Sequence, residues 1–295
     1  MRWRRKSGAS NSLSIVGFRL SAARLSLTFK QLRCLLSTPP ASNTQAPFPK
    51  TRNVVLDILA EGRRKNIIQL LFEVDANAMR AQIARLTAAS GETVSITCYV
   101  ARILAGTVAA NPRIHAYRHK GRELIMFADV DLSVMVEREV DGALLPLPYI
   151  VRAANQMTFP DLDKKLKHAK SAKLYEDGPL SALEAQFFSL PRILRKFVWY
   201  FARRDAHLFR ELAGTVGVTS MGMYANGRSV LVPITPMTLT LSIGAIYSQP
   251  MLVDGIVTER DFLQLNLSAD HDIIDGAPLM RFAATLRENL ERNGN

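Results

Sequence analysis

Apolar residues along the chain follow two spacings, one typical of helices and one typical of strands. Residues 76–89 carry apolar side chains at intervals of three and four, whereas residues 261–269 alternate leucines with polar residues. The same criteria predict further helices over 54–64, 93–110, 158–175 and 277–292. They predict further strands over 67–74, 122–127, 130–137, 143–149, 216–220, 229–233 and 239–247. This mixture predicts a layered α+β domain with helices on a large mixed sheet.

The first 50 residues are set apart by their charge. They contain six arginines and three lysines, and no aspartate or glutamate precedes Asp57. The stretch 1–38 has the composition of a mitochondrial transit peptide, and equally that of a disordered basic extension or of a start codon placed too far upstream. Residues 37–47 have the composition of a linker. We predict a basic extension over 1–50, disordered or for targeting, and a folded domain over 51–295. We expect a cytoplasmic protein or, alternatively, one of the mitochondrial matrix.

Charge and cysteine content narrow the classes of function. Of the net charge of +12, the extension supplies +9, so the folded domain is nearly balanced and a nucleic-acid partner is not expected. The two cysteines, Cys34 and Cys98, lack the spacing of a zinc site or a disulfide scaffold, and no metal site is expected. No run of about 18 apolar residues predicts a membrane-spanning helix. Four histidines are expected to be surface or packing residues: His115, His119, His168 and His207.

The sharpest chemical feature is the segment Asp270-His271-Asp272-Ile273-Ile274-Asp275-Gly276, between a predicted strand and the closing helix. A histidine at such a turn can project into a cleft and accept a proton near neutral pH. Asp275 can orient the turn or the ring, and Gly276 allows a tight entry into the helix. A single histidine beside an acid is more often structural, so the residues alone leave both interpretations open.

Several segments resemble one family, in that family's order. Residues 265–277 are similar to the D-H-R-x-x-D-G signature of the catalytic domain in the dihydrolipoamide acyltransferase components of 2-oxoacid dehydrogenase complexes. Residues 214–223 resemble its G-T-F-T-I-S-N-L-G segment, and residues 233–246 resemble its I-I-N-P-P-Q and L-G-V-G-A-I segments. Residues 129–136 and 142–146 resemble its D-I-G-V-A-V and G-L-L-V-P-V strands.

This resemblance runs from about residue 52 to 292 and implies a fold and an assembly. Chloramphenicol acetyltransferases share the core of the family. We therefore expect a chloramphenicol acetyltransferase-like α+β fold, with a two-layer arrangement of a mixed sheet and helices on one face. The family works as trimers, which build larger cubic or icosahedral cores in some members, and each active site lies between neighbouring subunits. A homotrimer or larger homo-oligomer is expected.

The resemblance also implies an activity. It implies transfer of an acyl group between a thioester of coenzyme A, the acyl-CoA substrate, and a thiol acceptor of the dihydrolipoyl type, without a metal. His271 would be the general base, and Asp275 would hold its turn. Thr219 of the neighbouring subunit would hydrogen-bond the oxyanion where the family has a serine. The residues expected to line the substrate site are Ser220, Asp270 and Gly276.

Three departures from the family matter. The chain leaves no room for a lipoyl domain and shows no D-K-A type motif, so a lipoyl group would have to be carried on a separate protein. Asp272 replaces the usual arginine, which changes the local charge by two units. Residues 183–212 have the character of an insertion.

The insertion combines basic and aromatic residues. Its stretch 187–210 contains seven aromatic residues and six lysines or arginines. A helix of this composition can lie in a membrane interface and gather anionic lipid. The interpretation we favour here is packing on the trimer or over the substrate channel, and nucleic-acid binding is the least expected use.

Two other functions stay open at the level of sequence. One is a non-catalytic trimeric assembly protein of the same fold, and the other is a membrane-surface acyltransferase with a hydroxyl acceptor. The presence of His271, Asp275 and a hydroxyl group at position 219 favours the thiol acyltransferase. The acyl group and the acceptor depend on the shape of a pocket, which the sequence does not give.

Overall fold

A computed structural model describes residues 44, 48, 52–140, 143–171, 190–222, 227–253 and 255–292. Its helices are α2 (Arg52–Gly62), α3 (Ala76–Ser90), α4 (Ile96–Ala109), α5 (Phe159–Ser171), α7 (Arg192–Ala202), α8 (Ala206–Ala213) and α9 (Gly276–Glu291). Its strands are β1 (Ile67–Asp75), β2 (Tyr117–His119), β3 (Glu123–Ile125), β4 (Leu132–Val140), β5 (Ala143–Val151), β6 (Val216–Ser220), β7 (Leu239–Val253) and β8 (Ile256–Asp270). Two short 3-10 helices, Pro112–His115 and Ala154–Gln156, complete these elements.

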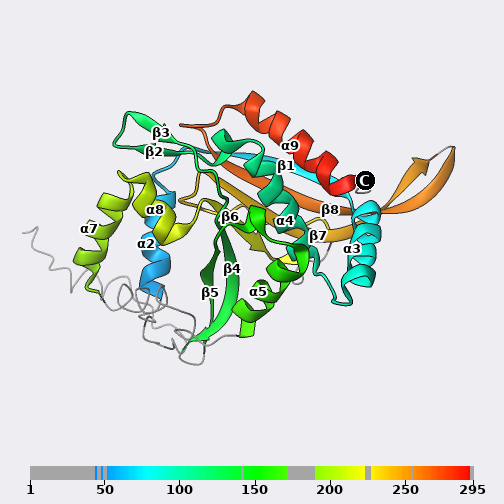
Figure 1. The fold of residues 1–295 in the computed structure, drawn as a ribbon, viewed down its shortest axis with the longest axis horizontal. Helices are drawn as coiled ribbons and strands as arrows, with labels where there is room; N and C mark the ends of the chain where they lie inside the picture. Colours follow the sequence, from blue (N-terminus) through cyan, green and yellow to red (C-terminus); the bar gives the residue numbers. More distant parts are fainter. Residues whose placement is uncertain are drawn as a thin grey trace, which may run out of the picture. The chain divides into compact units, whose positions relative to one another are not determined.

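Within the described ranges, one mixed sheet of six strands has the order β1-β8-β7-β6-β4-β5. β8 pairs antiparallel with β1 and β7, β4 pairs antiparallel with β5, and β6 is parallel to both of its neighbours. β2 and β3 form a separate ribbon. β7 and β8 continue together beyond the other strands as a long hairpin (Figure 1). This topology places the end of β8 beside the start of β1 and of β7.

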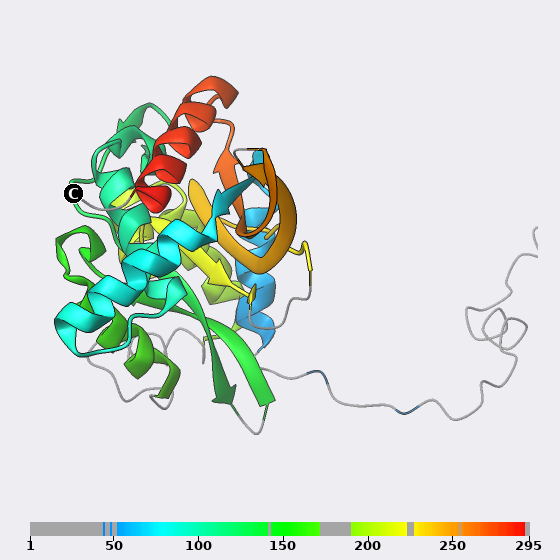
Figure 2. The ribbon, with the colours of Figure 1, turned by 90° about the vertical axis from the view of Figure 1, so that its right-hand side faces the viewer.

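One face of the sheet is covered by α3, α4, α5 and α9, while α2 lies on the other side of it (Figure 2). Leu265 and Leu267 of β8 point to the covered face because they alternate with polar residues, and both are fully buried. They belong to one hydrophobic cluster with Leu104 of α4 and Leu286 of α9. The predicted α+β class, with a mixed sheet and a layer of helices packed on it, is confirmed, and α2 is a helix beyond that layer.

The opposite face of the sheet carries polar side chains. Asn266 and Ser268 alternate with the buried leucines of β8, and both donate to Oε1 of Gln69 on β1, at 2.9 and 2.6 Å. Thr240 and Ser242 follow the same alternation on β7, opposite Ser268 and Asn266. This polar face therefore offers hydroxyl and amide groups, where the covered face offers hydrocarbon.

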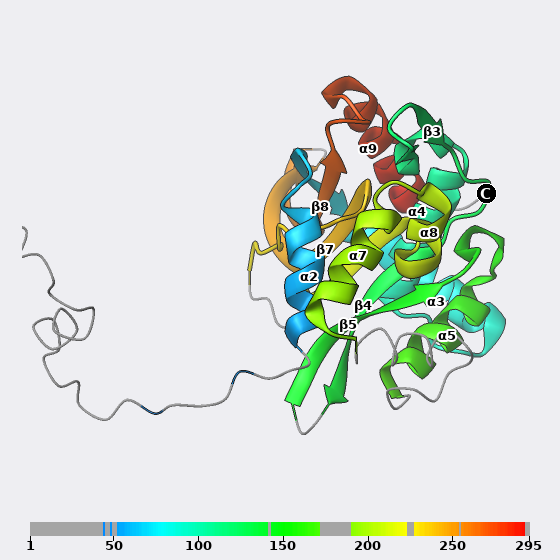
Figure 3. The ribbon, with the colours of Figure 1, turned by 90° about the vertical axis from the view of Figure 1, so that its left-hand side faces the viewer.

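A second, smaller core joins α7 and α8 to the β2–β3 ribbon, with Ile58 of α2 packed against it (Figure 3). Tyr117 stacks at a tilt on Phe209, with ring centroids 4.7 Å apart, and Trp199 packs on the same ring. Arg195 of α7 donates to Asp57 of α2 at 2.6 Å, and both side chains are buried. This ion pair and these rings fix α7 to the domain.

Most predicted elements match observed ones within a few residues, and one does not. Residues 229–233 were predicted as a strand but form no strand pairing in the structure. The carbonyl of Ser229 accepts a hydrogen bond from Ala245 of β7, and the prolines at 233 and 236 remove donors that a ladder needs. Three predictions lie wholly or partly outside the described residues: the extension over 1–50 apart from Thr44 and Phe48, the end of the predicted helix at 172–175, and residues 183–189 of the insertion.

Candidate active site

The turn that carries His271 forms where β8 ends and α9 begins, and we call residues 270–276 the histidine turn. The backbone N–H groups of Ile273 and Ile274 both donate to the carbonyl of Asp270, at 3.0 and 2.9 Å. The side chain of Ile274 is buried in the main core, so it ties the turn to the domain. The backbone of Asp275 is extended and forms the N-cap position of α9.

The imidazole of His271 is accessible from solvent. The side chain is 47% exposed, and its Nδ1 lies 3.9 Å from Oδ1 of Asp275, whose side chain is 82% exposed. That separation allows an ion pair but is too long for a hydrogen bond. Gly276, the first residue of α9, has open space where a Cβ would lie. The ring is therefore accessible, and Asp275 does not hold it through a hydrogen bond.

The residues that precede β1 hold the backbone of the histidine turn. The carbonyl of Asn66 accepts the backbone N–H of His271 at 2.7 Å, and its Nδ2 donates to Oδ1 of Asp272 at 2.9 Å. Nζ of Lys65 lies 2.5 Å from Oδ2 of Asp270, whose side chain is 4% exposed. Oδ1 of Asp270 in turn accepts the backbone N–H of Asp272. The backbone beneath the exposed imidazole is thus fixed by contacts on both sides of His271.

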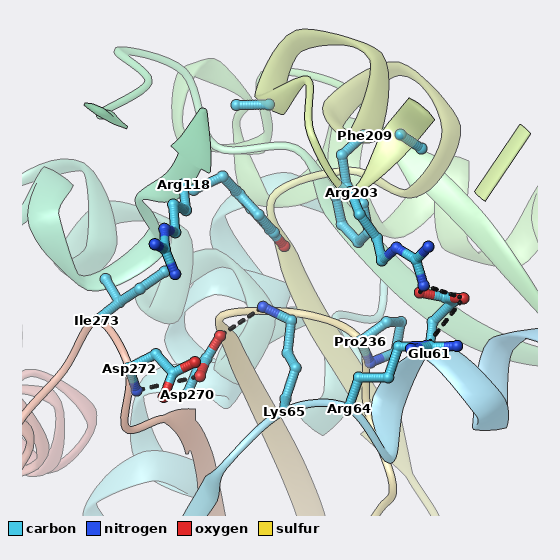
Figure 4. A pocket seen from close by; sticks show the side chains of 13 residues that line it. Glu61, Arg64, Lys65, Arg118, Arg203, Phe209, Pro236, Asp270, Asp272 and Ile273 are labelled. Atoms are coloured by element: carbon cyan, nitrogen blue, oxygen red, sulfur yellow. Dashed lines mark hydrogen bonds and ion pairs between the residues drawn. The ribbon is translucent and has the colours of Figure 1, made fainter. Parts of the chain in front are cut away.

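A pocket lies beside the histidine turn, between the end of α2, strand β2, and helices α7 and α8 (Figure 4). Its lining residues are Glu61, Arg64, Lys65, Tyr117, Arg118, Ala202, Arg203, Ala206, Phe209, Pro236, Asp270, Asp272 and Ile273. Lys65 points to Asp270, and Arg203 points to both carboxylate oxygens of Glu61 at 3.2 Å (Figure 4). The lining combines aromatic rings with charged side chains, so the pocket suits a ligand with an apolar part and an ionic part.

Thr219 and Ser220 lie on opposite faces of the sheet. Val216 and Val218 belong to the main core, so Thr219 points to the polar face, where it lies next to Ser242 in the register. The hydroxyl of Ser220 lies 3.0 Å from that of Thr97 on α4, on the helix side. Only Thr219 is therefore placed to meet a group that approaches the polar face, and a substrate-binding role for Ser220 stays a prediction.

The structure does not bring Thr219 and His271 together within one chain. Thr219 is in register with Ser242, and Ser242 with Asn266, which precedes His271 by five positions on β8. At about 3.3 Å per residue along a strand and about 4.8 Å between strands, the two residues lie on the order of 20 Å apart. A reaction that uses both groups needs a second copy of the chain.

Cys98 and two of the other histidines are buried in packing, and the two remaining described histidines lie at the surface. Burial in the main core, followed by the charge of Asp163, raises the pKa of the Cys98 thiol to about 12, so no thiolate nucleophile forms there. His115 and His119 are buried, and His168 and His207 are exposed, as predicted for packing and surface residues. Across the described ranges, no three histidine, cysteine, aspartate or glutamate side chains gather as a metal site would require.

Sequence reasoning missed the residues that hold the histidine turn. Lys65 and Asp270 are 205 positions apart, and Asn66 and Asp272 are 206 positions apart. The basic cluster 63–65 before a predicted strand was a visible signal, but it gave no indication of its partner. Arg118 and Arg203 of the pocket likewise come from separate elements that only the fold joins.

Comparison with known proteins identifies relatives whose similarity covers part of this chain and part of their own sequence. The succinyltransferase component of the 2-oxoglutarate dehydrogenase complex of Bartonella vinsonii subsp. berkhoffii is 27% identical over 171 residues, 58% of this chain and 34% of that protein. The acetyltransferase component of the pyruvate dehydrogenase complex of Zymomonas mobilis is 22% identical over 270 residues, 87% of this chain and 54% of that protein. This chain therefore spans between a third and about half of the length of these relatives.

Solved structures show the same fold. A probable dihydrolipoamide acetyltransferase of Listeria monocytogenes superposes with a TM-score of 0.64 at 17% identity, covering 87% of this chain and 99% of that chain. The cubic core of a pyruvate dehydrogenase multienzyme complex superposes with a TM-score of 0.61 at 16% identity, covering 86% and 96%. The expected fold is thereby confirmed.

A family model describes the 2-oxoacid dehydrogenases acyltransferase (catalytic domain), and it matches residues 40–186 and 202–294. The unmatched residues 187–201 contain nearly all of α7. The matched stretches contain β6 with Thr219, the histidine turn, and the strand β8 and helix α9 on either side of it. This chain belongs to the 2-oxoacid dehydrogenase acyltransferase catalytic-domain family.

Proposed function

We propose that this chain transfers an acyl group between a thioester of coenzyme A and a thiol of the dihydrolipoyl type that a separate protein carries. The observation that carries the proposal is the accessible imidazole of His271 on a backbone fixed by Lys65 and Asn66. A reacting group held in this way loses little orientational freedom when substrate binds. Family membership supports the class of reaction.

In the proposed reaction, His271 takes the proton of the acceptor thiol as the sulfur attacks the thioester carbonyl. The tetrahedral intermediate carries a negative charge on the former carbonyl oxygen. When it collapses, the carbon–sulfur bond to coenzyme A breaks and the proton passes from the imidazole to the sulfur of coenzyme A. No acyl group is bonded to the protein at any point, and coenzyme A is a substrate.

Thr219 of a neighbouring copy would donate the hydrogen bond to that oxygen. Its position on the polar face of the sheet, on the order of 20 Å from His271 of the same chain by the register, supports a site shared between copies. A hydroxyl donor of this kind contributes about 2.7–4 kcal/mol to the stabilisation of the transition state. The proposal therefore includes a homotrimer or larger assembly, as the family resemblance implies.

Mixed oligomers test both parts of the proposal. His271→Ala and Thr219→Val chains are co-expressed with different tags, and the mixed species is purified. Each variant alone should lose activity by at least about a hundredfold in acyl-CoA turnover with dihydrolipoamide. If a site takes His271 from one copy and Thr219 from the next, random mixing regenerates about a quarter of the sites.

Thr219→Ser is the matched control, because it keeps the hydroxyl donor and should keep most of the activity. Mixed oligomers that stay as inactive as the separate variants would contradict the shared site. Turnover by His271→Ala equal to that of the unchanged chain would contradict the general base, and with it the proposed activity.

A further inference from the structure

The outward side of α7 is apolar. Three of its side chains, Ile193, Phe197 and Phe201, are 70%, 57% and 57% exposed, and Leu194 and Tyr200 beside them are 47% and 42% exposed. We call these five residues the α7 ridge. Their spacing places them on one arc of the helix, since residues three or four positions apart share a face.

The α7 ridge lies opposite the side by which α7 is anchored. Arg195, Trp199 and Ala202 are the buried residues of this helix, and they follow the same spacing on the other arc. A surface helix ordinarily turns polar residues away from the core. Here the hydrocarbon faces outward from a helix whose orientation is fixed by the buried ion pair with Asp57, so rotation of the helix cannot hide it.

Cations border the α7 ridge on one side. Arg192, Lys196 and Arg204 carry no ion pair with any carboxylate of the described residues. The guanidinium of Arg204 lies 3.8 Å from the centroid of the Tyr200 ring. The backbone carbonyl of Arg204 accepts the N–H of Lys120, which brings the basic β2–β3 turn to the same place. The neighbouring Asp205 is engaged elsewhere, since it accepts from two backbone N–H groups at the start of α8.

We propose that the α7 ridge docks this protein on a membrane surface that contains anionic lipid. Aromatic and aliphatic side chains would enter the boundary between headgroups and acyl chains, and the bordering cations would meet the lipid phosphates and carboxylates. The charge favours anionic lipid as the partner, because α7 carries cations beside its apolar side and no acidic residue of its own. None of the helices in the described part of the chain combines the length and the hydropathy of a membrane-spanning segment.

The placement of α7 fits an added docking element. The family model leaves residues 187–201 unmatched, so the ridge is additional to the domain that the relatives share. α7 lies on the outside of the domain, in front of the sheet in Figure 3. Its last turn, with Ala202 and Arg203, lines the pocket beside the histidine turn. Docking would therefore bring the pocket close to the membrane surface.

A fluorophore at position 193 tests the contact directly. Ile193→Cys and Leu252→Cys, each in the full chain with Cys34→Ser, are labelled with an environment-sensitive dye. Both positions carry aliphatic side chains that are 70% exposed, and Leu252 lies at the tip of the β7–β8 hairpin, far along the chain from the basic residues of α7. We expect a blue shift at position 193, and none at 252, with vesicles of phosphatidylcholine and phosphatidylserine at 7:3. This comparison is independent of any binding by the basic residues 1–50.

Vesicle flotation then distinguishes the contribution of the α7 ridge to membrane binding from that of the bordering cations. Phe197→Ser with Phe201→Ser should lower the bound fraction by at least about tenfold. Arg192→Gln and Lys196→Gln should each lower it by about fivefold, with a smaller effect in high salt. Leu252→Ser with Val257→Ser should float like the unchanged protein. Circular dichroism confirms that each variant is folded.

Three results would overturn the proposal. The first is an unchanged emission at position 193 with anionic vesicles, and the second is an equal shift at positions 193 and 252. The third is a change in oligomeric mass, measured by light scattering, on replacing Phe197 and Phe201 while flotation stays the same. That result would assign the ridge to a contact between copies of this chain. None of these readouts depends on acyl transfer.

Discussion

The histidine turn and α7 are both fastened to the domain by ion pairs, and the two pairs differ in depth. Lys65 is 21% exposed and Asp270 is 4% exposed, so the pair beneath the turn is partly open to water. Arg195 and Asp57 are 6% and 8% exposed, so the pair beneath α7 is closed on both sides. Charges that leave water together are expensive to separate, and the cost rises with burial. The deeper pair therefore holds its element more firmly.

The two regions differ more in the side chains that they expose to solvent than in the burial of their ion pairs. The turn presents an imidazole and two carboxylates, which water solvates well. The α7 ridge presents two phenyl rings and three further apolar side chains, which water does not solvate well. A contiguous exposed apolar surface on a soluble domain marks a contact with something else. The turn thus presents groups that water solvates, whereas the α7 ridge leaves hydrocarbon exposed to water.

Removing Arg195, the cation of the more deeply buried pair, should give the largest change in the free energy of unfolding. Arg195→Met leaves the Asp57 carboxylate buried without its partner, which should lower the free energy of unfolding by about 3–5 kcal/mol. Urea unfolding at fixed protein concentration measures it. The double variant Arg195→Met with Asp57→Leu removes both charges and should recover most of the loss. A loss below about 1 kcal/mol in the single variant would contradict the firmer attachment of α7.

The corresponding change under the turn should cost less stability and more activity. Lys65→Met should lower the free energy of unfolding by about 2 kcal/mol, because the partner pair is partly solvated. It should also lower kcat by about tenfold while KM changes little, since the backbone under His271 loses a constraint. Lys65→Arg should restore both values. A rise in KM with kcat unchanged would instead make Lys65 a substrate ligand of the pocket.

The sequence predicted the histidine turn far better than its supports. His271, Asp275 and Gly276 form a local pattern between a strand and a helix, and local patterns survive in sequence. The supports of the turn, Lys65 and Asn66, depend on the pairing of β1 with β8, which brings together residues about 200 positions apart. The basic and aromatic composition of α7 could also be seen in the sequence. The structure was needed to show which side of the helix faces outward, because it buries Trp199 on the other side.

Acid should weaken the second core, which packs on a buried histidine. Loss of solvation on burial lowers the pKa of His115 from an ordinary 6.5 to about 4, and the ring meets Phe127 edge to face. The unfolded chain therefore takes up a proton below about pH 6.5, and the folded chain does not until about pH 4. Stability is full above pH 6.5 and falls by about 2 kcal/mol between pH 7.5 and pH 5 from this group. Urea unfolding at the two pH values measures this difference.

His115→Phe removes the titrating ring and supplies the control. The variant should lose about 2 kcal/mol less than the unchanged protein over the same pH interval. Equal losses in the two proteins would show that carboxylates elsewhere cause the acid sensitivity.

A substitution at Asp272 should give the smallest effect, and it distinguishes the hydrogen bond of this side chain from its charge. Asp272→Asn keeps an oxygen to accept from Asn66 and removes one negative charge beside the pocket. Because this contact is exposed, the free energy of unfolding should change by less than about 0.5 kcal/mol. KM for the anionic acyl-CoA should fall by about twofold at low salt and by less at high salt, where charges are screened. A loss of more than about 1 kcal/mol in urea unfolding would mean that the charge of Asp272, like that of Asp270, helps to hold the turn to the domain.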